Sequence, residues 1–463
     1  MNDIKKGHTV ELEIAKTAFG GLGIARLDGL VVFVRGAVPG DRIKGRVVRK
    51  KKDYLEAKTI ELLEPSPDRT QPPCPYSGHC GGCQWQHVRY DRQLAYKGEQ
   101  VKETLGRIGA LQDIRVRDVL PSQRRFGYRN KMEFTFSDRR WVLPDELPKP
   151  DSDSEFALGL HVPGAFHKVI DIDACLLQPE EGNRILRAVK DYVRGSGLPV
   201  YGLKSHRGFW RFLALRHSSM DEWMVNVITS EEHSAVNVDL AAFLTARFRR
   251  IRTVVNNINT RRASIAVGER ETVLYGDGII KDYIGTFGFQ ISANSFFQTN
   301  TLGGETLYRQ IADYAELHGS EIVLDLYSGT GTIPVFLSDR AERIVGVEIG
   351  RSAVRDAERN CHANDIHNCE FLWGDIGESL MRLKIKPDVV ILDPPRAGVH
   401  REAMAPILGL DAERIVYVSC NPATLARDLE QMSRRYDVIE VQPVDMFPHT
   451  YHIETVAKLQ RRK

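Results

Sequence analysis

The sequence contains no apolar stretch long enough to cross a bilayer, and residues 1–7 (MNDIKKG) begin no apolar signal region. Net charge is also nearly absent, because 64 Lys and Arg residues stand against 61 Asp and Glu residues and leave only +3. That charge by itself does not indicate a nucleic-acid partner. No internal repeat or long low-complexity tract is present. These absences exclude a membrane-spanning chain, and 463 residues predict a cytoplasmic protein of two or three domains with no evident obligate protein partner.

The small net charge is unevenly distributed. Residues 49–52 form a compact basic run, and six arginines gather between 247 and 262. Such runs contact phosphates in nucleic-acid-binding proteins, but they also occur on solvated protein surfaces. Charge alone favours the solvated surface for these two runs.

Seven cysteines in a reducing compartment do not predict a disulfide framework. Three of them, Cys74, Cys80 and Cys83, are closely spaced among glycines, which indicates a metal site. Zinc and an iron–sulfur cluster both suit thiolate ligands, and the spacing leaves both open. The candidates for a fourth ligand are His79, His87 and a distant cysteine such as Cys175.

The first two thirds of the chain divide by pattern. Residues 1–67 carry short alternating strands with glycine turns, typical of a five-stranded barrel of the oligonucleotide-binding type. The cysteine segment follows at 69–90, and an apolar stripe predicts a helix over 91–110. Residues 125–288 mix strand-like and helix-like pieces, which predicts an α+β central domain.

From about residue 290 onward, apolar strands alternate with helices. This rhythm predicts a parallel, doubly wound α/β sheet of the Rossmann-like kind. The predicted strands are 322–325, 343–348, 369–375, 388–393 and 415–418.

A glycine loop, Asp325 to Gly331, follows the first of these strands, and Glu348 ends the next strand 19 residues after Gly329. Glycines allow close approach of a ligand, and an acid at this spacing commonly binds ribose hydroxyls. Pro334 stands where a dinucleotide-binding loop would have its third glycine. The loop instead resembles the S-adenosylmethionine loop of methyltransferases, and Asp375 at the end of the third strand also favours a cofactor.

Cys420 follows the fifth strand, in Ser-Cys-Asn-Pro. A free cysteine is usually a buried structural residue, but chemistry collects at the carboxyl ends of such strands. Methyl transfer to C5 of uracil needs a thiolate, because attack at C6 makes C5 nucleophilic. A base must then remove the C5 proton. Glu454 is the candidate base, with His449 and His452 as rivals.

Several further segments carry a family resemblance. Asp393-Pro394-Pro395-Arg396 lacks the aromatic residue that follows Asn/Asp-Pro-Pro in amino-directed methyltransferases. Together the motifs resemble the 5-methyluridine RNA methyltransferase family, specifically its ribosomal-RNA branch, over nearly the whole chain, and residues 1–67 resemble its TRAM module. The segments that carry the resemblance are Cys74, Cys80, Cys83 and Cys175; residues 128–131; residues 295–300; residues 325–331; residues 393–396; residues 419–422; and residues 452–454.

The resemblance implies a role for each site. Cys420 is expected to be the nucleophile and Glu454 the base, and 23S rRNA the substrate. A [4Fe-4S] cluster is expected on Cys74, Cys80, Cys83 and Cys175. The region that binds S-adenosylmethionine and the target base is expected to be lined by Gln298, Tyr327, Glu348 and Asp393.

The resemblance also implies a domain division and leaves alternatives. The expected domains are the barrel at 1–67, a central iron–sulfur and RNA-binding domain at 68–90 and 125–288, and the methyltransferase domain at 91–124 and 289–463. The alternatives are methylation of tRNA, an inactive RNA-binding ribosome-assembly factor, and a nucleotide-dependent oxidoreductase. Pro334 and the lack of a second cysteine cluster disfavour the oxidoreductase.

Overall fold

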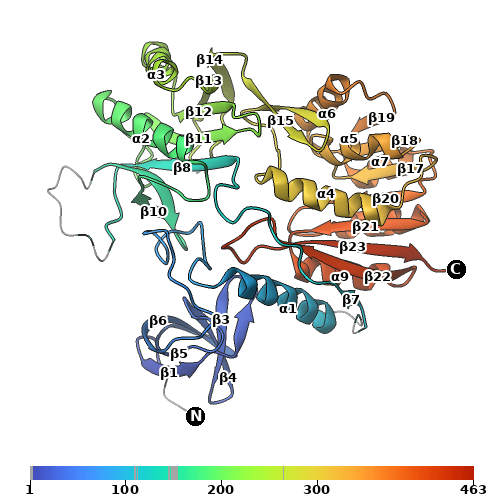
Figure 1. Ribbon diagram of the computed structural model, residues 1–463, viewed down its shortest axis with the longest axis horizontal. Helices are drawn as coiled ribbons and strands as arrows, with labels where there is room; N and C mark the ends of the chain where they lie inside the picture. Colours follow the sequence, from blue (N-terminus) through green and yellow to red (C-terminus); the bar gives the residue numbers. More distant parts are fainter. Residues whose placement is uncertain (1–3, 109–110, 112, 144–145, 147–154, 264) are drawn as a thin grey trace.

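The computed structural model describes residues 4–108, 111, 113–143, 146, 155–263 and 265–463. Within these residues the strands form sheets of six, seven, two and eight strands. Figure 1 shows the six-stranded sheet as a small separate unit at the N-terminal end and the eight-stranded sheet at the C-terminal end. None of the described helices combines the length and apolarity that a membrane span requires.

The N-terminal sheet has the order β1-β5-β6-β4-β3-β2 and wraps around aliphatic side chains such as Val32, Val34 and Ile43. The sequence predicts five strands here, and the structure has six. The additional strand is β2, which pairs with β3 across the Gly20–Gly21 turn and is too short to show a period of its own. The strands are β1 (Thr9–Glu13), β2 (Lys16–Ala18), β3 (Leu22–Leu27), β4 (Leu30–Arg35), β5 (Arg42–Lys50) and β6 (Tyr54–Glu64).

Helix α1 (Tyr90–Ile108) confirms the helix predicted over 91–110 as far as residue 108, and residues 109–110 lie outside the described residues. It runs from the N-terminal sheet along the C-terminal sheet (Figure 1) and packs against α9 (Pro422–Met432). Its buried face holds Val101 and Leu105 but also two fully buried polar residues one turn apart, Gln93 and Lys97. Buried polar groups need partners, and both of these find them in the C-terminal part of the chain.

The central sheet has the order β10-β9-β8-β11-β12-β13-β14. Helices α2 (Glu180–Gly195) and α3 (Ser234–Arg247) contact each other and share one core with the sheet. A hairpin, β15 (Ile279–Ile284) and β16 (Phe287–Ser292), then leads to the C-terminal sheet. The strands are β8 (Lys131–Ser137), β9 (Ala157–Val162), β10 (Ala165–Asp171), β11 (Trp210–His217), β12 (Trp223–Thr229), β13 (Ile251–Ile258) and β14 (Arg270–Tyr275).

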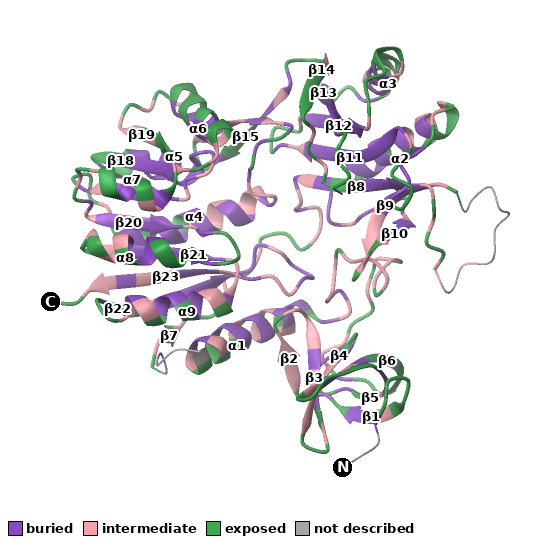
Figure 2. Cartoon of the chain, turned by 180° about the vertical axis from the view of Figure 1, so that it is seen from behind, coloured by how far each residue is buried: buried purple, intermediate pink, exposed green. Residues whose placement is uncertain are grey.

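The C-terminal sheet has the order β19-β18-β17-β20-β21-β23-β22-β7. Along β17, Val323 packs into the core on one face and Leu324 into the core on the other, so both faces are covered (Figure 2). The strands are β7 (Arg115–Val116), β17 (Ile322–Leu326), β18 (Arg343–Glu348), β19 (Cys369–Trp373), β20 (Val389–Leu392), β21 (Arg414–Ser419), β22 (Tyr436–Val444) and β23 (Glu454–Arg461). The helices besides α9 are α4 (Thr301–Ala315), α5 (Thr332–Leu337), α6 (Arg351–Ala363), α7 (Ile376–Arg382) and α8 (Arg401–Gly409).

The five predicted strands are confirmed, and they are parallel, but β23 runs antiparallel to β21. The order reverses between β17 and β20, which is where open α/β sheets bind ligands, outside the carboxyl ends of the strands. Because β23 is antiparallel, its first residue lies at that same edge. The register pairs Ser419 of β21 with Thr455 of β23. Cys420, directly after Ser419, is therefore next to Glu454, directly before Thr455.

Candidate functional site

The glycine loop after β17 turns sharply from strand to helix. Tyr327, Gly329 and Gly331 have φ angles of 70°, 54° and 74°, and Gly331 caps α5. The backbone N–H groups of Tyr327 and Ser328 both donate to the carbonyl of Val347 on β18, at 3.1 Å. Three of the five residues 327–331 have left-handed backbone conformations. The resulting sharp turn leaves the end of β17 open to a ligand at the sheet edge.

Asp325 at the end of β17 is a buried carboxylate without a protein partner. Neither of its oxygens, nor Oγ of Ser328, has a hydrogen-bond partner among the described residues. Burial raises the pKa of Asp325 well above its usual value, and the charges of Asp393 and Glu348 add to the effect. Buried polar groups are normally paired, so these atoms fit a site for a polar ligand.

Glu348 joins the loops that follow β17 and β18. Its Oε2 accepts from the N–H of Gly329 at 3.0 Å, and its Oε1 accepts from the N–H of Gly350 at 2.6 Å. Each carboxylate oxygen keeps capacity for a further donor. Asp375 lies after the next strand, β19, where it is exposed and caps α7 by accepting from the N–H of Glu378 at 3.3 Å.

Gln298 and Tyr327 flank this edge. The buried hydroxyl of Tyr308 lies 2.8 Å from Oγ1 of Thr332, at the start of α5, and also hydrogen-bonds the side chain of Gln298. Gln298 is thereby held next to the helix that follows the glycine loop. Burial raises the pKa of the half-buried Tyr327.

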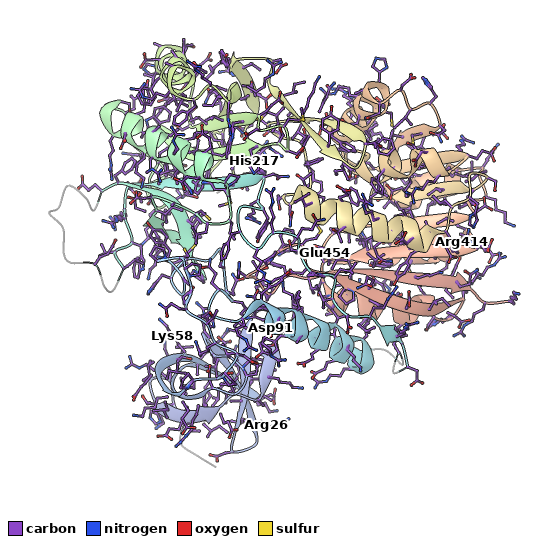
Figure 3. All side chains as sticks on the ribbon, in the orientation of Figure 1. Arg26, Lys58, Asp91, His217, Arg414 and Glu454 are labelled. Atoms are coloured by element: carbon purple, nitrogen blue, oxygen red, sulfur yellow. The ribbon has the colours of Figure 1, made fainter. Side chains whose placement is uncertain are left out.

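Cys420, Asp393 and Glu454 form a second group, at the ends of β21 and β20 and the start of β23. The loops after β20 and β21 are tied together, because Nδ2 of Asn421 donates to the carbonyl of Arg396 at 3.1 Å. Figure 3 shows Glu454 where the C-terminal sheet faces the central part of the molecule. All three side chains are half-buried.

The acids and the thiol perturb one another. Burial raises the pKa of Glu454 to about 8, with Asp393 adding and Arg396 opposing. Burial raises the pKa of Asp393 to about 7. The pKa of the Cys420 thiol rises to about 11, first through burial and then through the charge of Glu454. A carboxylate with a pKa near neutrality is suited to accept and release a proton.

The two histidines that rival Glu454 have other surroundings. The backbone N–H and the ring Nδ1 of His449 both hydrogen-bond the side chain of Gln93. Its ring stacks on that of Phe126, with centroids 4.3 Å apart. Burial lowers the pKa of His452 to about 4. The strand register favours Glu454 as the neighbour of Cys420.

The four cysteines of the predicted metal site line one cavity of about 370 Å³. Its described lining includes Cys175, on the segment before α2, and neither His79 nor His87. In the described part of the chain, no three His, Cys, Asp or Glu side chains are arranged to hold a single metal ion. The expected [4Fe-4S] cluster therefore stays a prediction.

Phe296 is an exposed aromatic residue beside the site. It is 62% exposed, and its carbonyl accepts from Oγ1 of Thr330 in the glycine loop at 3.0 Å. Its neighbour Phe297 is buried in the core, and Phe447 is half-buried. Of these three aromatic residues, Phe296 alone presents an exposed ring, which a base could stack on.

The strand order, the final antiparallel strand and the glycine loop with its acid define a Rossmann-like methyltransferase. Comparison with known proteins agrees. Residues 284–462 match the family model of tRNA (uracil-5-)-methyltransferases, and residues 4–60 match the TRAM domain.

Relatives match nearly the full length. An RNA methyltransferase of Chlorobaculum tepidum is 43% identical over 99% of this chain and 97% of its own. One from Porphyromonas gingivalis is 40% identical over 97% and 99%. The crystal structure of the Pyrococcus abyssi tRNA (uracil-54, C5)-methyltransferase with S-adenosyl-L-homocysteine covers 97% of this chain and 100% of its own, with a TM-score of 0.76 and 29% identity.

The chain therefore belongs to the RNA (uracil-5-)-methyltransferase family with an N-terminal TRAM domain. It is an S-adenosylmethionine-dependent RNA methyltransferase.

Proposed function

We propose that this enzyme methylates C5 of a uridine in 23S rRNA through a covalent bond between Cys420 and uracil C6. The observation that carries the proposal is the antiparallel pairing of β21 with β23, which sets Cys420 beside Glu454 and near Asp393. An RNA-binding assembly factor without activity would have no use for this pairing of a thiol with a carboxylate of raised pKa.

The chemistry follows from the groups present. Sγ of Cys420 bonds to C6, and the electrons of the C5–C6 double bond move toward O4, which makes C5 nucleophilic. S-adenosylmethionine, when bound, supplies the electrophilic methyl group that C5 receives. Glu454 then accepts the C5 proton, the double bond re-forms, and the bond from Sγ to C6 breaks, returning the thiolate.

The residues for the cofactor are proposed from the unpaired atoms at the sheet edge. Asp325 and Ser328 would accept hydrogen bonds from its amino group, because their buried oxygens have no partner in the described chain. The spare capacity of Glu348 suits ribose hydroxyls. Gln298, Tyr327, Asp375 and Asp393 complete the proposed cofactor and base region.

We propose that Cys74, Cys80, Cys83 and Cys175 hold a [4Fe-4S] cluster. The cavity that all four thiols line, and that His79 and His87 do not, supports a site with four thiolate ligands, as such a cluster has. The methyl transfer needs no electron transfer, so the cluster would have a structural or RNA-binding role. The expected three-domain division, with the methyltransferase domain at 91–124 and 289–463, remains part of the proposal.

The RNA substrate is proposed to reach Cys420 with its uridine unstacked, since base chemistry requires the base outside the helical stack. The TRAM sheet would hold the surrounding RNA, and exposed Phe296 would stack on a base. The ground for proposing 23S rRNA is the resemblance of the sequence motifs to the ribosomal-RNA branch of the family. Methylation of tRNA is the second candidate, favoured by the full-length similarity to the tRNA enzyme of Pyrococcus abyssi.

The test is transfer of labelled methyl from S-adenosylmethionine to 23S rRNA and to tRNA transcripts, followed by nucleoside analysis for 5-methyluridine. We expect product in 23S rRNA, none with Cys420→Ala, and full activity with Cys369→Ala, a half-buried cysteine of the same sheet. Product in tRNA alone would select the second candidate, and activity of Cys420→Ala would refute the covalent mechanism.

A further inference from the structure

The loop that leads into Glu454 is held by the segment that carries the cysteines. The backbone N–H groups of Gln84 and Trp85, the two residues directly after Cys83, both donate to the carbonyl of His449 at 2.9 Å. Trp85 is 2% exposed and packs on Tyr96 of α1 with ring centroids 6.2 Å apart. The chain leaving the cysteine cavity is thus bonded to the loop between β22 and β23.

A second connection starts beside Cys175. The chain at 127–129 lies along the residues after this cysteine, because Gly127 N donates to the carbonyl of Leu176 and Arg129 N to that of Leu177, at 2.9 and 2.8 Å. Between them, the hydroxyl of Tyr128 donates to the carbonyl of Pro448 at 3.1 Å. The two parts of the cysteine site therefore reach adjacent residues of the loop, His449 from the Cys83 side and Pro448 from the Cys175 side.

Helix α1 supports the loop from the other side. Oε1 of Gln93 accepts from the N–H of His449 at 2.8 Å, and its Nε2 donates to the carbonyl of Trp85 at 3.0 Å. Nζ of Lys97 forms a fully buried ion pair with Asp445 at 2.6 Å and donates to the carbonyl of Phe447 at 3.1 Å. Asn300 donates to the carbonyl of Met446 at 2.8 Å, and Asp445 N donates to the carbonyl of Leu120 at 2.9 Å. These bonds and α1 hold residues 445–447, while the cysteine segments hold Pro448 and His449.

We propose that the group bound in the four-cysteine cavity positions Glu454, acting through Gln84, Trp85 and Tyr128 on residues 445–452. This inference rests on the proposed roles of Glu454 and of the cysteines. When the cavity is filled, the segments around Cys83 and Cys175 are rigid, and the loop they hold delivers Glu454 to the C5 proton. Gln84, Trp85 and Tyr128 are positioning residues and do not touch the reacting atoms.

The coupling is selective for one step. Cys420 follows β21 and is held by its own turn, in which the side chain of Asn421 accepts from the N–H of Ala423 at 3.1 Å and donates to the carbonyl of Arg396. None of these bonds involves the loop 445–452. Loss of the coupling is therefore expected to slow breakdown of the covalent RNA adduct, which needs Glu454, and to spare its formation, which needs Cys420.

The first experiment compares Tyr128→Phe with Tyr436→Phe. Tyr436 is a matched control, because its buried hydroxyl also donates to a backbone carbonyl, that of Ala412 at 3.0 Å, away from the loop. We expect Tyr128→Phe to slow adduct breakdown roughly threefold to tenfold, as for loss of one buried hydrogen bond, with formation unchanged. Equal breakdown rates in both variants would overturn the proposal.

The second experiment needs no RNA. Hydrogen exchange of the peptide spanning 445–452 is measured in anaerobically purified protein before and after iron is removed with a chelator. We expect faster exchange in this peptide after removal, alongside faster exchange in 74–88. Faster exchange in 74–88 alone would overturn the coupling, as would protein that holds neither metal nor sulfide.

The two experiments separate this inference from the proposed function. Activity retained by Cys420→Ala would refute the covalent mechanism, but the exchange of residues 445–452 would still decide whether the cavity controls the loop.

Discussion

Replacement of Glu454 by glutamine should trap the enzyme on its RNA. Glutamine keeps the shape of the side chain and one acceptor oxygen, but its neutral amide cannot accept the C5 proton. Positioned general bases contribute about 10²- to 10⁴-fold to proton transfer, or about 3 to 5 kcal/mol of barrier. We expect Glu454→Gln to form the adduct at close to the normal rate and to release it slower by that factor.

The pH dependence of breakdown gives the same prediction a second signature. A base acts only when deprotonated, and the pKa of Glu454 is raised to about 8. Breakdown of preformed adduct should therefore slow about tenfold for each pH unit below 8 and level off above it. Were His452 the base, its pKa of about 4 would make breakdown independent of pH between 6 and 8.

The assay is a single-turnover reaction in which free RNA and slowly migrating adduct are separated on denaturing gels. Measuring breakdown from isolated adduct keeps the titration of Cys420, whose pKa is about 11, out of the result. Normal release by Glu454→Gln, or a flat pH profile together with slow release by His452→Asn, would refute the assignment of the base.

Three further predictions concern the cofactor site and its support. Asp325→Asn should weaken binding of S-adenosylhomocysteine about tenfold to a hundredfold in calorimetry. It should also raise the melting temperature of the protein, because it removes a buried unpaired carboxylate. Unchanged binding would contradict the assignment of Asp325 to the cofactor site. Gly331→Ala should destabilise the protein by about 1–3 kcal/mol in urea unfolding, because its Cβ would lie 2.7 Å from Cβ of Ala357 at a φ of 74°; Gly409→Ala, with open space around it, is the control. Lys97→Met should cost about 3–5 kcal/mol in the same assay by leaving Asp445 buried without its partner, and a loss under 1 kcal/mol would show the pair to be unimportant.

The sequence predicts those elements whose pattern is local. The strand Arg343–Glu348 is found within its predicted bounds, because a short apolar run between two charged residues needs no tertiary information to be recognised. The helix predicted over 91–110 is found for the same reason, since its apolar stripe has helical spacing.

Features set by long-range pairing were not predictable. The direction of β23 depends on its pairing with β21, and a sequence pattern of alternation is the same for either direction. That direction is what brings Glu454 to Cys420, so the sequence alone left Glu454 with His449 and His452 as rivals, and the family resemblance selected Glu454. β2 is only three residues long and exists through its pairing with β3.

Two features of the site gain their meaning only from the structure. Asp325 stands in the glycine motif of the sequence. Its two carboxylate oxygens are recognised as candidate ligand-binding atoms only because the structure shows them buried without a partner among the described residues. Gln93 and Lys97 interrupt an apolar stripe and suggest solvent exposure, whereas the structure buries both against residues more than 300 positions away. Polar residues at the apolar positions of an amphipathic helix are the sequence signal that could have marked Gln93 and Lys97.

The covalent role of Cys420 is tested most directly by incubating the enzyme and S-adenosylmethionine with 23S rRNA that contains 5-fluorouridine, and mapping the crosslinked peptide by mass spectrometry. Fluorine at C5 leaves no proton for Glu454 to remove, so the adduct cannot resolve. We expect a stable adduct in which the peptide that contains Cys420 is bonded to uracil that carries the transferred methyl group. Methylated RNA without any adduct, or an adduct on another cysteine, would contradict it.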